Sequence, residues 1–476
     1  MTLRAASAVA AALVVVGAAA CRDTRPRPAP RPSPSSGSNR SILLVTIDTL
    51  RADHLGTYGY SRRTSPRIDG LARQGVVFDH AYTYWPKTRG SMAILLTGRR
   101  PSQNGYSKSH PMLLGFNPTL ASVLKEAGYL TAAAVDNPNV AAANGYAKGF
   151  DSYRETWEEA GLATEADRAR AITETALAFF KAAPRDRPFF LWLHYVSPHA
   201  PYTPPPPFDS AFLDAAARAG PRLPIAPGLH GGIPKQWAVR GQDRLGYYVA
   251  QYDGEIAAVD QEVGRVMEAL RDSRAAGRTV VAVTSDHGES LGEHDYYFDH
   301  GEDVFEPSLA IPLVIAGPGL PAGRRVSGFA STLDLVPTLL DAVKVSYPPD
   351  LAGTSLLPMV RGESTGPDRL FAQNDRNLSA TWDRRFKLVA TPAGDGRRLA
   401  LYDRTQDPGE TRDQSRSHAD ELRAQTRELE QQLERADREW AATRRLTEGA
   451  GGEGPMSPEA CEKLKALGYA DARCPP

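Results

Sequence analysis

The sequence is poor in cysteine and carries no excess of charge of either sign. Three cysteines occur among 476 residues, and none lies near the polar motifs described below, which excludes thiol catalysis and a cysteine-ligated zinc site. Lysine and arginine together number 56, and so do aspartate and glutamate. The chain therefore lacks the basic balance that favours nucleic-acid binding, and we expect no nucleic-acid partner.

The N-terminus has no apolar run that is convincing as a membrane span, but it is typical of an export signal. Arg4 precedes the small, apolar run Ala5–Ala20, which ends at Cys21. This pattern predicts a bacterial lipoprotein signal over residues 1–20, with Cys21 lipidated after cleavage. Ala18 stands where such signals usually have leucine, so a plain secretory signal is the alternative. Both predict export, and the first predicts a lipid anchor at the cell envelope, in the outer membrane or periplasm.

Two further features can be predicted from composition and from cysteine spacing. Residues 21–40 are rich in proline, arginine and serine without apolar periodicity, which predicts an extended tether. Near the other end, Cys461 and Cys474 are close enough in sequence to form a disulfide in an exported protein, or to remain free thiols.

Short apolar runs alternate with amphipathic stretches between residues 41 and 347. This alternation predicts an α/β domain with a doubly wound, mostly parallel sheet. The expected strands cover 42–47, 131–135, 189–195, 279–285 and 311–316, and the expected helices cover 66–74, 120–127, 173–183, 252–270 and 333–343.

The pattern changes after residue 347. Short polar strands over 370–373, 386–390 and 398–402 predict a small antiparallel subdomain spanning 348–415. A helical tail follows over 416–476, with one charged helix expected over 418–445. Residues 203–240 are rich in proline, glycine and alanine, so we expect a long loop that shapes the site.

Metal-binding and proton-transferring side chains follow three of the expected strands. Asp48 ends the first strand, His199 follows the strand over 189–195, and Asp286 and His287 follow the strand over 279–285. Each residue alone would be an ordinary turn residue. Because the carboxyl ends of parallel strands lie at one edge of a sheet, we expect these side chains to lie close together.

Asp48, Asp286 and His287 are oxygen and imidazole donors that suit Ca²⁺, Mg²⁺, Mn²⁺ or Zn²⁺. Thr88 stands at the start of an expected helix and could supply a fourth ligand, because a metal-bound hydroxyl ionises readily. The alternative for Thr88 is a helix cap. Its neighbours Lys87 and Arg89 would add positive charge for an anionic substrate, in addition to the helix N-terminus.

A second histidine could take part in proton transfer. His300 follows the third strand closely and precedes a glycine, so it is a candidate acid for a leaving group. The alternative is an ordinary surface histidine.

These residues and their surroundings resemble the sulfatase family, within the alkaline phosphatase superfamily. The resemblance implies that family's fold, one divalent metal ion, usually calcium, and hydrolysis of a sulfuric or phosphate ester of a small molecule or glycan. It extends over segments such as LLVTIDTLRADHLGTYGY (43–60), SMAILLTGRRPSQNG (91–105), FFLWLHYVSPHAPYTPP (189–205), TSDHGESLGEH (284–294) and LYDRTQDPGE (401–410).

The resemblance also assigns roles. It implies that Asp48, Asp286 and His287 ligate the metal and that Thr88 is the nucleophile. His199 matches a histidine near the bound anion, and His300 resembles the leaving-group acid.

The sequence departs from the family near the nucleophile. Sulfatases usually have cysteine or serine at position 88, which is oxidised to formylglycine, whereas threonine cannot become an aldehyde. Gly90 replaces a usual proline, Met92 a usual arginine and Thr49 a usual aspartate, and the lysine of a GKWH segment has no counterpart. A threonine nucleophile favours phosphate or phosphonate esters, while the overall likeness favours sulfuric esters. A phosphodiesterase or headgroup transferase and a catalytically silent binding protein are the alternatives.

Overall fold

The apolar run Ser41–Ile47 forms the strand β1, and every residue in it is buried. Side chains alternate across a strand, so Ile42 and Leu44 contribute to one hydrophobic core and Leu43 and Val45 to another. A strand that is apolar on both faces belongs inside a sheet covered on both sides. The sequence pattern therefore places β1 at the centre of a layered α/β fold.

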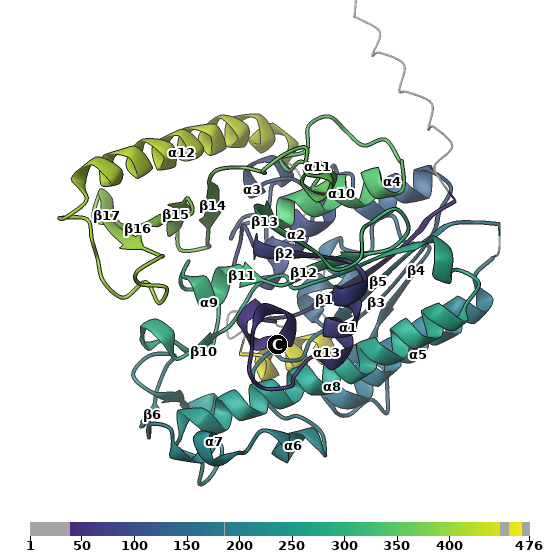
Figure 1. Ribbon diagram of the computed structural model, residues 1–476, viewed down its shortest axis with the longest axis horizontal. Helices are drawn as coiled ribbons and strands as arrows, with labels where there is room; N and C mark the ends of the chain where they lie inside the picture. The colour runs from purple at the N-terminus through teal and green to yellow at the C-terminus, as the bar shows by residue number, and fades with distance from the viewer. Residues whose placement is uncertain (1–38, 185, 448–456, 469–476) are drawn as a thin grey trace, which may run out of the picture. The chain divides into compact units, whose positions relative to one another are not determined.

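The computed structural model describes residues 39–184, 186–447 and 457–468 (Figure 1). In these residues a nine-stranded sheet has the order β11-β2-β12-β8-β1-β5-β3-β4, with β13 paired to β2. Strands β8, β1, β5, β3 and β4 are parallel, and β12 is antiparallel to β8. The predicted doubly wound, mostly parallel sheet is thus confirmed. Its other strands are β2 (Val76–Tyr82), β3 (Leu130–Val135), β4 (Ser152–Glu155), β5 (Phe189–Tyr195), β8 (Thr279–Thr284), β11 (Ala310–Ile311), β12 (Leu313–Ala316) and β13 (Arg324–Ser331).

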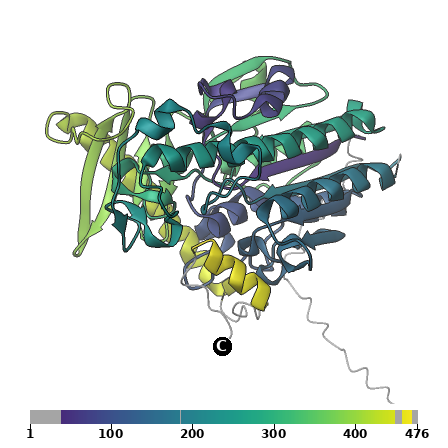
Figure 2. The ribbon, with the colours of Figure 1, turned by 90° about the horizontal axis from the view of Figure 1, so that it is seen from below.

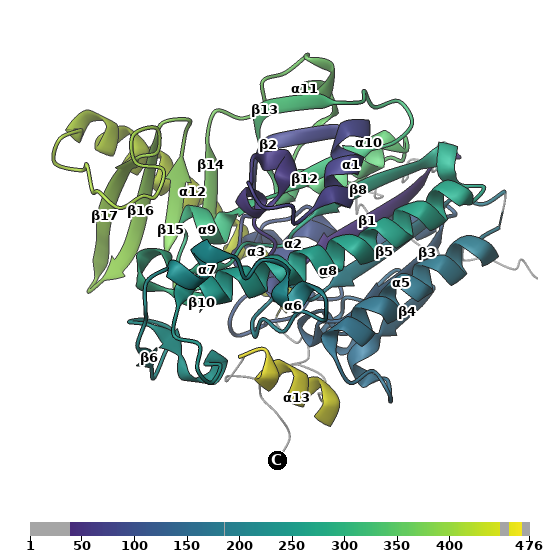
Figure 3. The ribbon, with the colours of Figure 1, turned by 60° about the horizontal axis from the view of Figure 1, so that its bottom comes forward.

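Helices cover both faces of this sheet (Figure 3). Helices α2, α4 and α10 bury their apolar residues in the core on one face, and α1, α5 and α8 bury theirs in the core on the other. The bounds are α1 (Pro66–Gln74), α2 (Thr88–Thr97), α3 (Pro101–Asn104), α4 (Leu120–Glu126), α5 (Glu165–Ala182), α8 (Leu245–Asp272), α9 (Glu306–Leu309), α10 (Leu335–Ala342) and α11 (Leu357–Arg361).

Several elements differ from the expectations. Helix α5 begins at Glu165, eight residues before the expected start, because its first turns are polar and are capped by Thr164 rather than marked by an apolar stripe. The expected loop over 203–240 contains the short elements α6 (Phe208–Ala211), α7 (Ala215–Ala219), β6 (Ile225–Ala226) and β7 (Ile233–Pro234). Helices α6 and α7 pack on α8, so this segment is ordered against the body of the fold.

The C-terminal part forms a second sheet, seen in Figure 2, whose strands pair antiparallel throughout. Its strands are β14 (Leu370–Gln373), β15 (Ser379–Trp382), β16 (Phe386–Ala393) and β17 (Gly396–Asp403), of which β15 was not expected. Helix α12 (Ala419–Thr447) packs on β15 and β16 and also contacts α3. A last helix, α13 (Pro458–Ala466), contacts the short helices η3 (Pro138–Val140) and η5 (Thr156–Glu158), which follow β3 and β4.

The described residues include no helix that is both long and apolar enough to cross a membrane. Residues 1–38, which hold the expected signal and most of the expected tether, lie outside the described part of the chain.

Candidate active site

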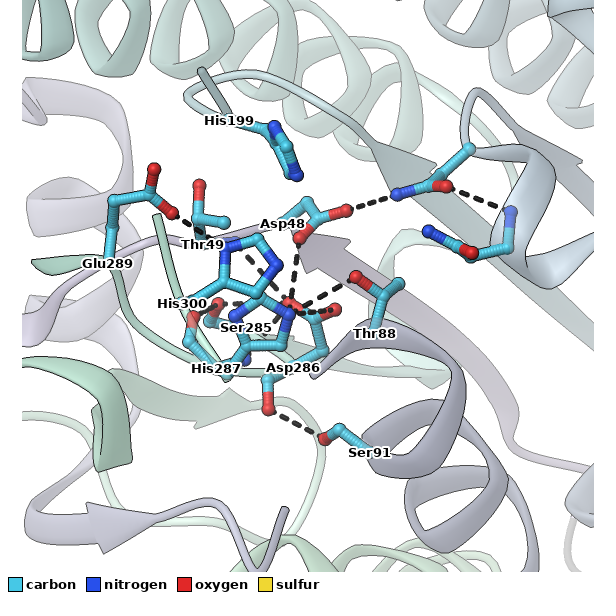
Figure 4. Close-up of polar contacts among 12 residues, drawn as sticks. Asp48, Thr49, Thr88, Ser91, His199, Ser285, Asp286, His287, Glu289 and His300 are labelled. Carbon is cyan, nitrogen blue, oxygen red and sulfur yellow. Dashed lines mark hydrogen bonds and ion pairs between the residues drawn. The ribbon is translucent and has the colours of Figure 1, made fainter. Parts of the chain in front are cut away.

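Two neighbouring strands deliver the expected metal ligands to one edge of the sheet. Asp48 follows β1, and Asp286 and His287 come just after its parallel neighbour β8. All three side chains are fully buried. One ligand atom from each lies within 4.8 Å of the others. Figure 4 shows the three side chains pointing toward one another. The strand-end prediction therefore places these three residues correctly in space.

The three side chains fit a divalent cation. Asp48 Oδ1 and Asp286 Oδ2 are buried and have no hydrogen-bond partner in the described structure. His287 donates from Nδ1 to the carbonyl oxygen of Gly288 at 2.9 Å, so Nε2 keeps its lone pair, 3.4 Å from Asp286 Oδ2. Burial, and then the charge of Asp286, raise the pKa of Asp48 well above its usual value. Two buried carboxylates beside a neutral imidazole call for a cation to compensate them.

Thr88 lies beside these ligands. It is the first residue of α2, and Lys87 occupies the N-cap position. Its Oγ1 lies 3.2 Å from His287 Nε2. One turn further on, Ser91 donates to the backbone carbonyl of Asp286 at 2.6 Å, which fixes the start of α2 against the end of β8. The hydroxyl and the positive end of the helix therefore both belong to the site.

His199 and His300 complete the wall of the site. Both are buried, which makes the surface alternative for His300 wrong. The His300 ring lies 4.1 Å from the His287 ring and 5.0 Å from the His199 ring, measured between centroids. Burial lowers the pKa of His199 to about 4 and, with the charges of the other two histidines, lowers that of His300 well below its usual value. Both imidazoles are thus neutral at pH 7.

Specific hydrogen bonds orient these two rings. His199 Nδ1 donates to the carbonyl oxygen of Ala200 at 2.6 Å. His300 Nδ1 lies 2.9 Å from Glu289 Oε2, and Glu289 Oε1 accepts a hydrogen bond from the hydroxyl of Tyr202 at 3.0 Å. Nδ1 of each ring is therefore engaged in a hydrogen bond that fixes the orientation of the ring.

The two cationic neighbours of Thr88 are placed differently. Lys87 is partly exposed, lies beside Gly301, and has its Nζ 3.9 Å from Asp375 Oδ2. Arg89 instead donates to Asn139 Oδ1 at 2.9 Å and to the carbonyl oxygen of Pro111 at 3.3 Å. Arg89 is thus held toward Asn139 and Pro111, whereas Lys87 lies at the N-cap of α2 beside Gly301.

Sequence reasoning missed three residues of the site. Asn137 donates to Asp48 Oδ2 at 2.5 Å, and His194 Nε2 lies 3.7 Å from the same oxygen. Glu289 holds His300, as described above. Asn137 comes two residues after β3, so the strand-end rule that selected Asp48 would have found it. His194 lies inside the apolar strand β5 and carries no such signal.

The departures from the family pattern have structural counterparts. Met92 is fully buried in the apolar core, where a charged side chain would have to be compensated. A Cβ atom on Gly90 would lie 2.4 Å from the Trp85 ring, so the ring occupies that space. Thr49 adopts a left-handed backbone conformation with φ of 55°, which is strained for a β-branched residue, and its buried hydroxyl has no partner in the described structure.

Of the expected cysteine features, Cys461 lies on α13 and is disulfide-bonded. Cys21 and Cys474 lie outside the described residues.

Comparisons with known proteins agree with this architecture. The family model described as sulfatase matches residues 40–345, and the model for the C-terminal region of N-sulphoglucosamine sulphohydrolase matches residues 292–439. The chain is 26% identical over 396 residues to arylsulfatase K of Xenopus laevis, covering 72% of this chain and 73% of that protein. It is 28% identical over 372 residues to human N-sulphoglucosamine sulphohydrolase, covering 70% of each.

Among solved structures, the phosphonate monoester hydrolase of Agrobacterium radiobacter superposes with a TM-score of 0.70 at 22% identity. The match covers 84% of this chain and 96% of that one, and at this identity it shows a shared fold. The sulfatase model spans more than half of the chain, including the cation ligands and the start of α2. The chain therefore belongs to the sulfatase family of metal-dependent ester hydrolases.

Proposed function

We propose that the chain hydrolyses a phosphate or phosphonate ester, with Thr88 as the nucleophile. The observation that carries this proposal is the position of Thr88 Oγ1, 3.2 Å from Nε2 of a cation ligand and at the N-terminus of α2. Asp48, Asp286 and His287 would hold the cation, and Thr88 would complete its ligand set. Bound there, a divalent cation would lower the pKa of the hydroxyl and attract the anionic ester. From the family resemblance, we propose Ca²⁺ as this ion.

In the first step, different side chains of the site attack phosphorus, transfer the proton and bind the anion. Thr88 Oγ1 attacks phosphorus, the new O–P bond forms, and the bond from phosphorus to the leaving oxygen breaks. His300 is neutral, so its Nε2 can accept the proton of the Thr88 hydroxyl and deliver it to the leaving oxygen. His199 and Lys87 hold the non-reacting oxygens of the ester. In the second step water attacks phosphorus and the bond from phosphorus to Thr88 Oγ1 breaks. The proton that the water loses balances the proton that Oγ1 regains.

Threonine chemistry decides the choice of ester. A sulfated formylglycine hydrate releases sulfate by collapsing to an aldehyde, whereas a sulfated threonine cannot release sulfate in this way. A phosphothreonine can instead be hydrolysed by attack of water at phosphorus. Hydrolysis of a sulfuric ester is the second candidate, which the sulfatase family match and the names of the curated relatives favour.

The test offers the purified protein aryl phosphate, aryl phosphonate and aryl sulfate esters with one common leaving group, each with a series of divalent cations. We expect phosphonate or phosphate turnover that requires a cation. Thr88→Ala should lower it by about 1,000-fold or more, and Thr88→Ser, which keeps a hydroxyl, should retain activity within roughly tenfold. Aryl sulfate turnover that is unchanged in Thr88→Ala would refute the assignment.

Product analysis separates hydrolysis from the alternatives. A hydrolase releases the free anion, whereas a transferase forms an adduct on an added alcohol acceptor. A silent binding protein would bind inorganic phosphate or sulfate without turnover of any ester.

We also propose that the protein is exported and anchored to the cell envelope through lipidated Cys21, where it would meet small-molecule or glycan esters. The N-terminal sequence supports this: a small, apolar run ends at the first cysteine and a tether follows. Membrane fractionation tests it. The native protein should sediment with membranes, and Cys21→Ser should be soluble with the same specific activity. A native protein that stays soluble would contradict the anchor.

A further inference from the structure

Helix α13 carries a buried lysine that pairs with the first residue of α5. Lys463 Nζ lies 2.5 Å from Glu165 Oε1, and only 9% of the lysine side chain is exposed. Two residues further along the same helix, Lys465 is exposed. A buried ammonium group is costly unless it is paired, so the Lys463–Glu165 contact fixes where α13 sits.

Other contacts of α13, whose position is seen in Figure 3, support the same placement. Ser457, its N-cap, donates to Glu158 Oε1 of η5 at 2.8 Å. At the other end, a Cβ atom on Gly468 would lie 2.7 Å from the ring of Trp237, so backbone and ring are in close contact. The helix also contacts η3, which follows Asn137, the residue that holds Asp48. Helix α13 is thus seated beside the segment that carries Asn137.

Lys463 enters a buried group of acids. Glu165 pairs with Arg168 as well, at 3.6 Å, and Arg168 also pairs with Asp136 at 2.8 Å. Glu255 is buried, and its Oε2 has no partner in the described structure. Burial and the charge of Glu165 raise the pKa of Glu255, whereas Lys463 lowers it. Without Lys463, this group would hold three acids and one cation.

The Lys463–Glu165 pair stands directly behind the segment that carries His199. Ser197 donates to Glu165 Oε2 at 3.3 Å, two residues before His199. The charges of Glu165 and Lys463 both act on the His199 imidazole, in opposite directions. A contact chain therefore runs from α13 through Glu165 and Ser197 to a ring that faces the site.

We infer that Lys463 is a positioning residue of the active site, which holds Glu165 and through it the segment Ser197–His199. This inference rests on the proposed function, because it takes His199 as a group that meets the anionic substrate. Helix α13 then contributes to catalysis from a segment 298 residues away from Glu165 in sequence. Docking of the helix alone would explain its apolar contacts, but it would not require a buried cation at this place.

The test compares Lys463→Met with Lys463→Arg and with the matched control Lys465→Met, all in the full chain. Because a shift of about 1 Å in a catalytic group can cost about 100-fold, Lys463→Met should lower kcat by roughly 10–100-fold and change KM by less. Lys463→Arg should restore much of the loss, and Lys465→Met should match the native protein. If Lys463→Met unfolds, the double variant Glu165→Gln/Lys463→Met, which removes both charges, replaces it.

A second measurement separates this inference from the proposed function. In protein labelled with ¹³C at the imidazole carbons, the His199 signal, assigned through His199→Gln, should shift in Lys463→Met and stay in place in Lys465→Met. If the native protein cleaves no ester, the proposed function fails and this signal still decides the inference. If Lys463→Met turns over as fast as the native protein, per folded molecule, and its His199 signal does not move, the inference is overturned.

Discussion

The active site has two halves that differ in origin. The cation half consists of Asp48, Asp286 and His287, which follow two hydrogen-bonded neighbouring strands. The anion half consists of Thr88, His199, His300 and Lys87, which come from the start of α2 and from two loops. The sheet edge carries residues that match the family's cation ligands, whereas Thr88 and Met92 on α2 stand where the family usually has cysteine or serine and arginine. Under the proposed function, the residues that hold the cation are kept while those around the anion differ from the family pattern.

The largest effect should follow a change in the cation half. Asp286→Asn removes one ligand charge, so turnover should fall by at least about 100-fold and divalent cation affinity should fall with it. In chelator-treated protein the same change should raise the free energy of unfolding by roughly 1–3 kcal/mol, because it removes repulsion between two buried carboxylates. Turnover, isothermal titration and thermal unfolding measure these effects.

Asp272→Asn serves as the control, because Asp272 is 74% exposed at the end of α8. It should change none of the three quantities. A chelated Asp286→Asn protein that is less stable than the chelated native protein would contradict the account of the cation half.

Sequence reasoning succeeded for the cation half because a single rule governs it. Parallel strands end at a common edge, so the residues after β1 and β8 had to lie close together. It failed for β2, whose place depends on pairing with the distant strands β11, β12 and β13. It also failed for β15, a four-residue strand between β14 and β16 that is too short to show an alternating pattern. His194 and Lys463 were missed for a related reason. One lies inside an apolar strand, and the other is a lysine on an amphipathic tail, so only tertiary contacts show that either belongs near the site.

The next effect tests whether α2 can be returned to the family pattern at position 92. Met92→Arg would place a guanidinium in the core, where Met92 is fully buried. An uncompensated buried charge should lower the free energy of unfolding by about 3–5 kcal/mol, whereas Met92→Leu should cost under about 1.5 kcal/mol. Chemical denaturation measures both. A Met92→Arg protein that is as stable as the native protein and binds phosphate more tightly would contradict this prediction.

A smaller effect should follow a change at Glu289, which orients His300. Glu289→Gln should slow cleavage of an alkyl ester by roughly 10–100-fold, because that leaving group needs the proton that His300 delivers. A nitrophenyl ester, whose leaving group needs no proton, should be affected much less. Glu302→Gln, in the loop just after His300, is the control. Equal slowing of both esters would show that Glu289 supports the fold rather than proton transfer.

The smallest effect should come from Asn137, which connects the two halves. Its amide donates to Asp48 Oδ2, and it also accepts a hydrogen bond from the backbone of Asn139, whose side chain binds Arg89 next to the nucleophile. Asn137→Leu leaves Asp48 without this donor, and outer-shell changes of this kind typically cost about tenfold in cation affinity. Asn139→Leu removes no contact to Asp48, so it should leave cation affinity unchanged. It removes a hydrogen-bond acceptor of Arg89, the residue after Thr88, so its effect should fall on KM. Cation titration of Asn137→Leu therefore reports on the cation half, and the KM of Asn139→Leu reports on substrate binding.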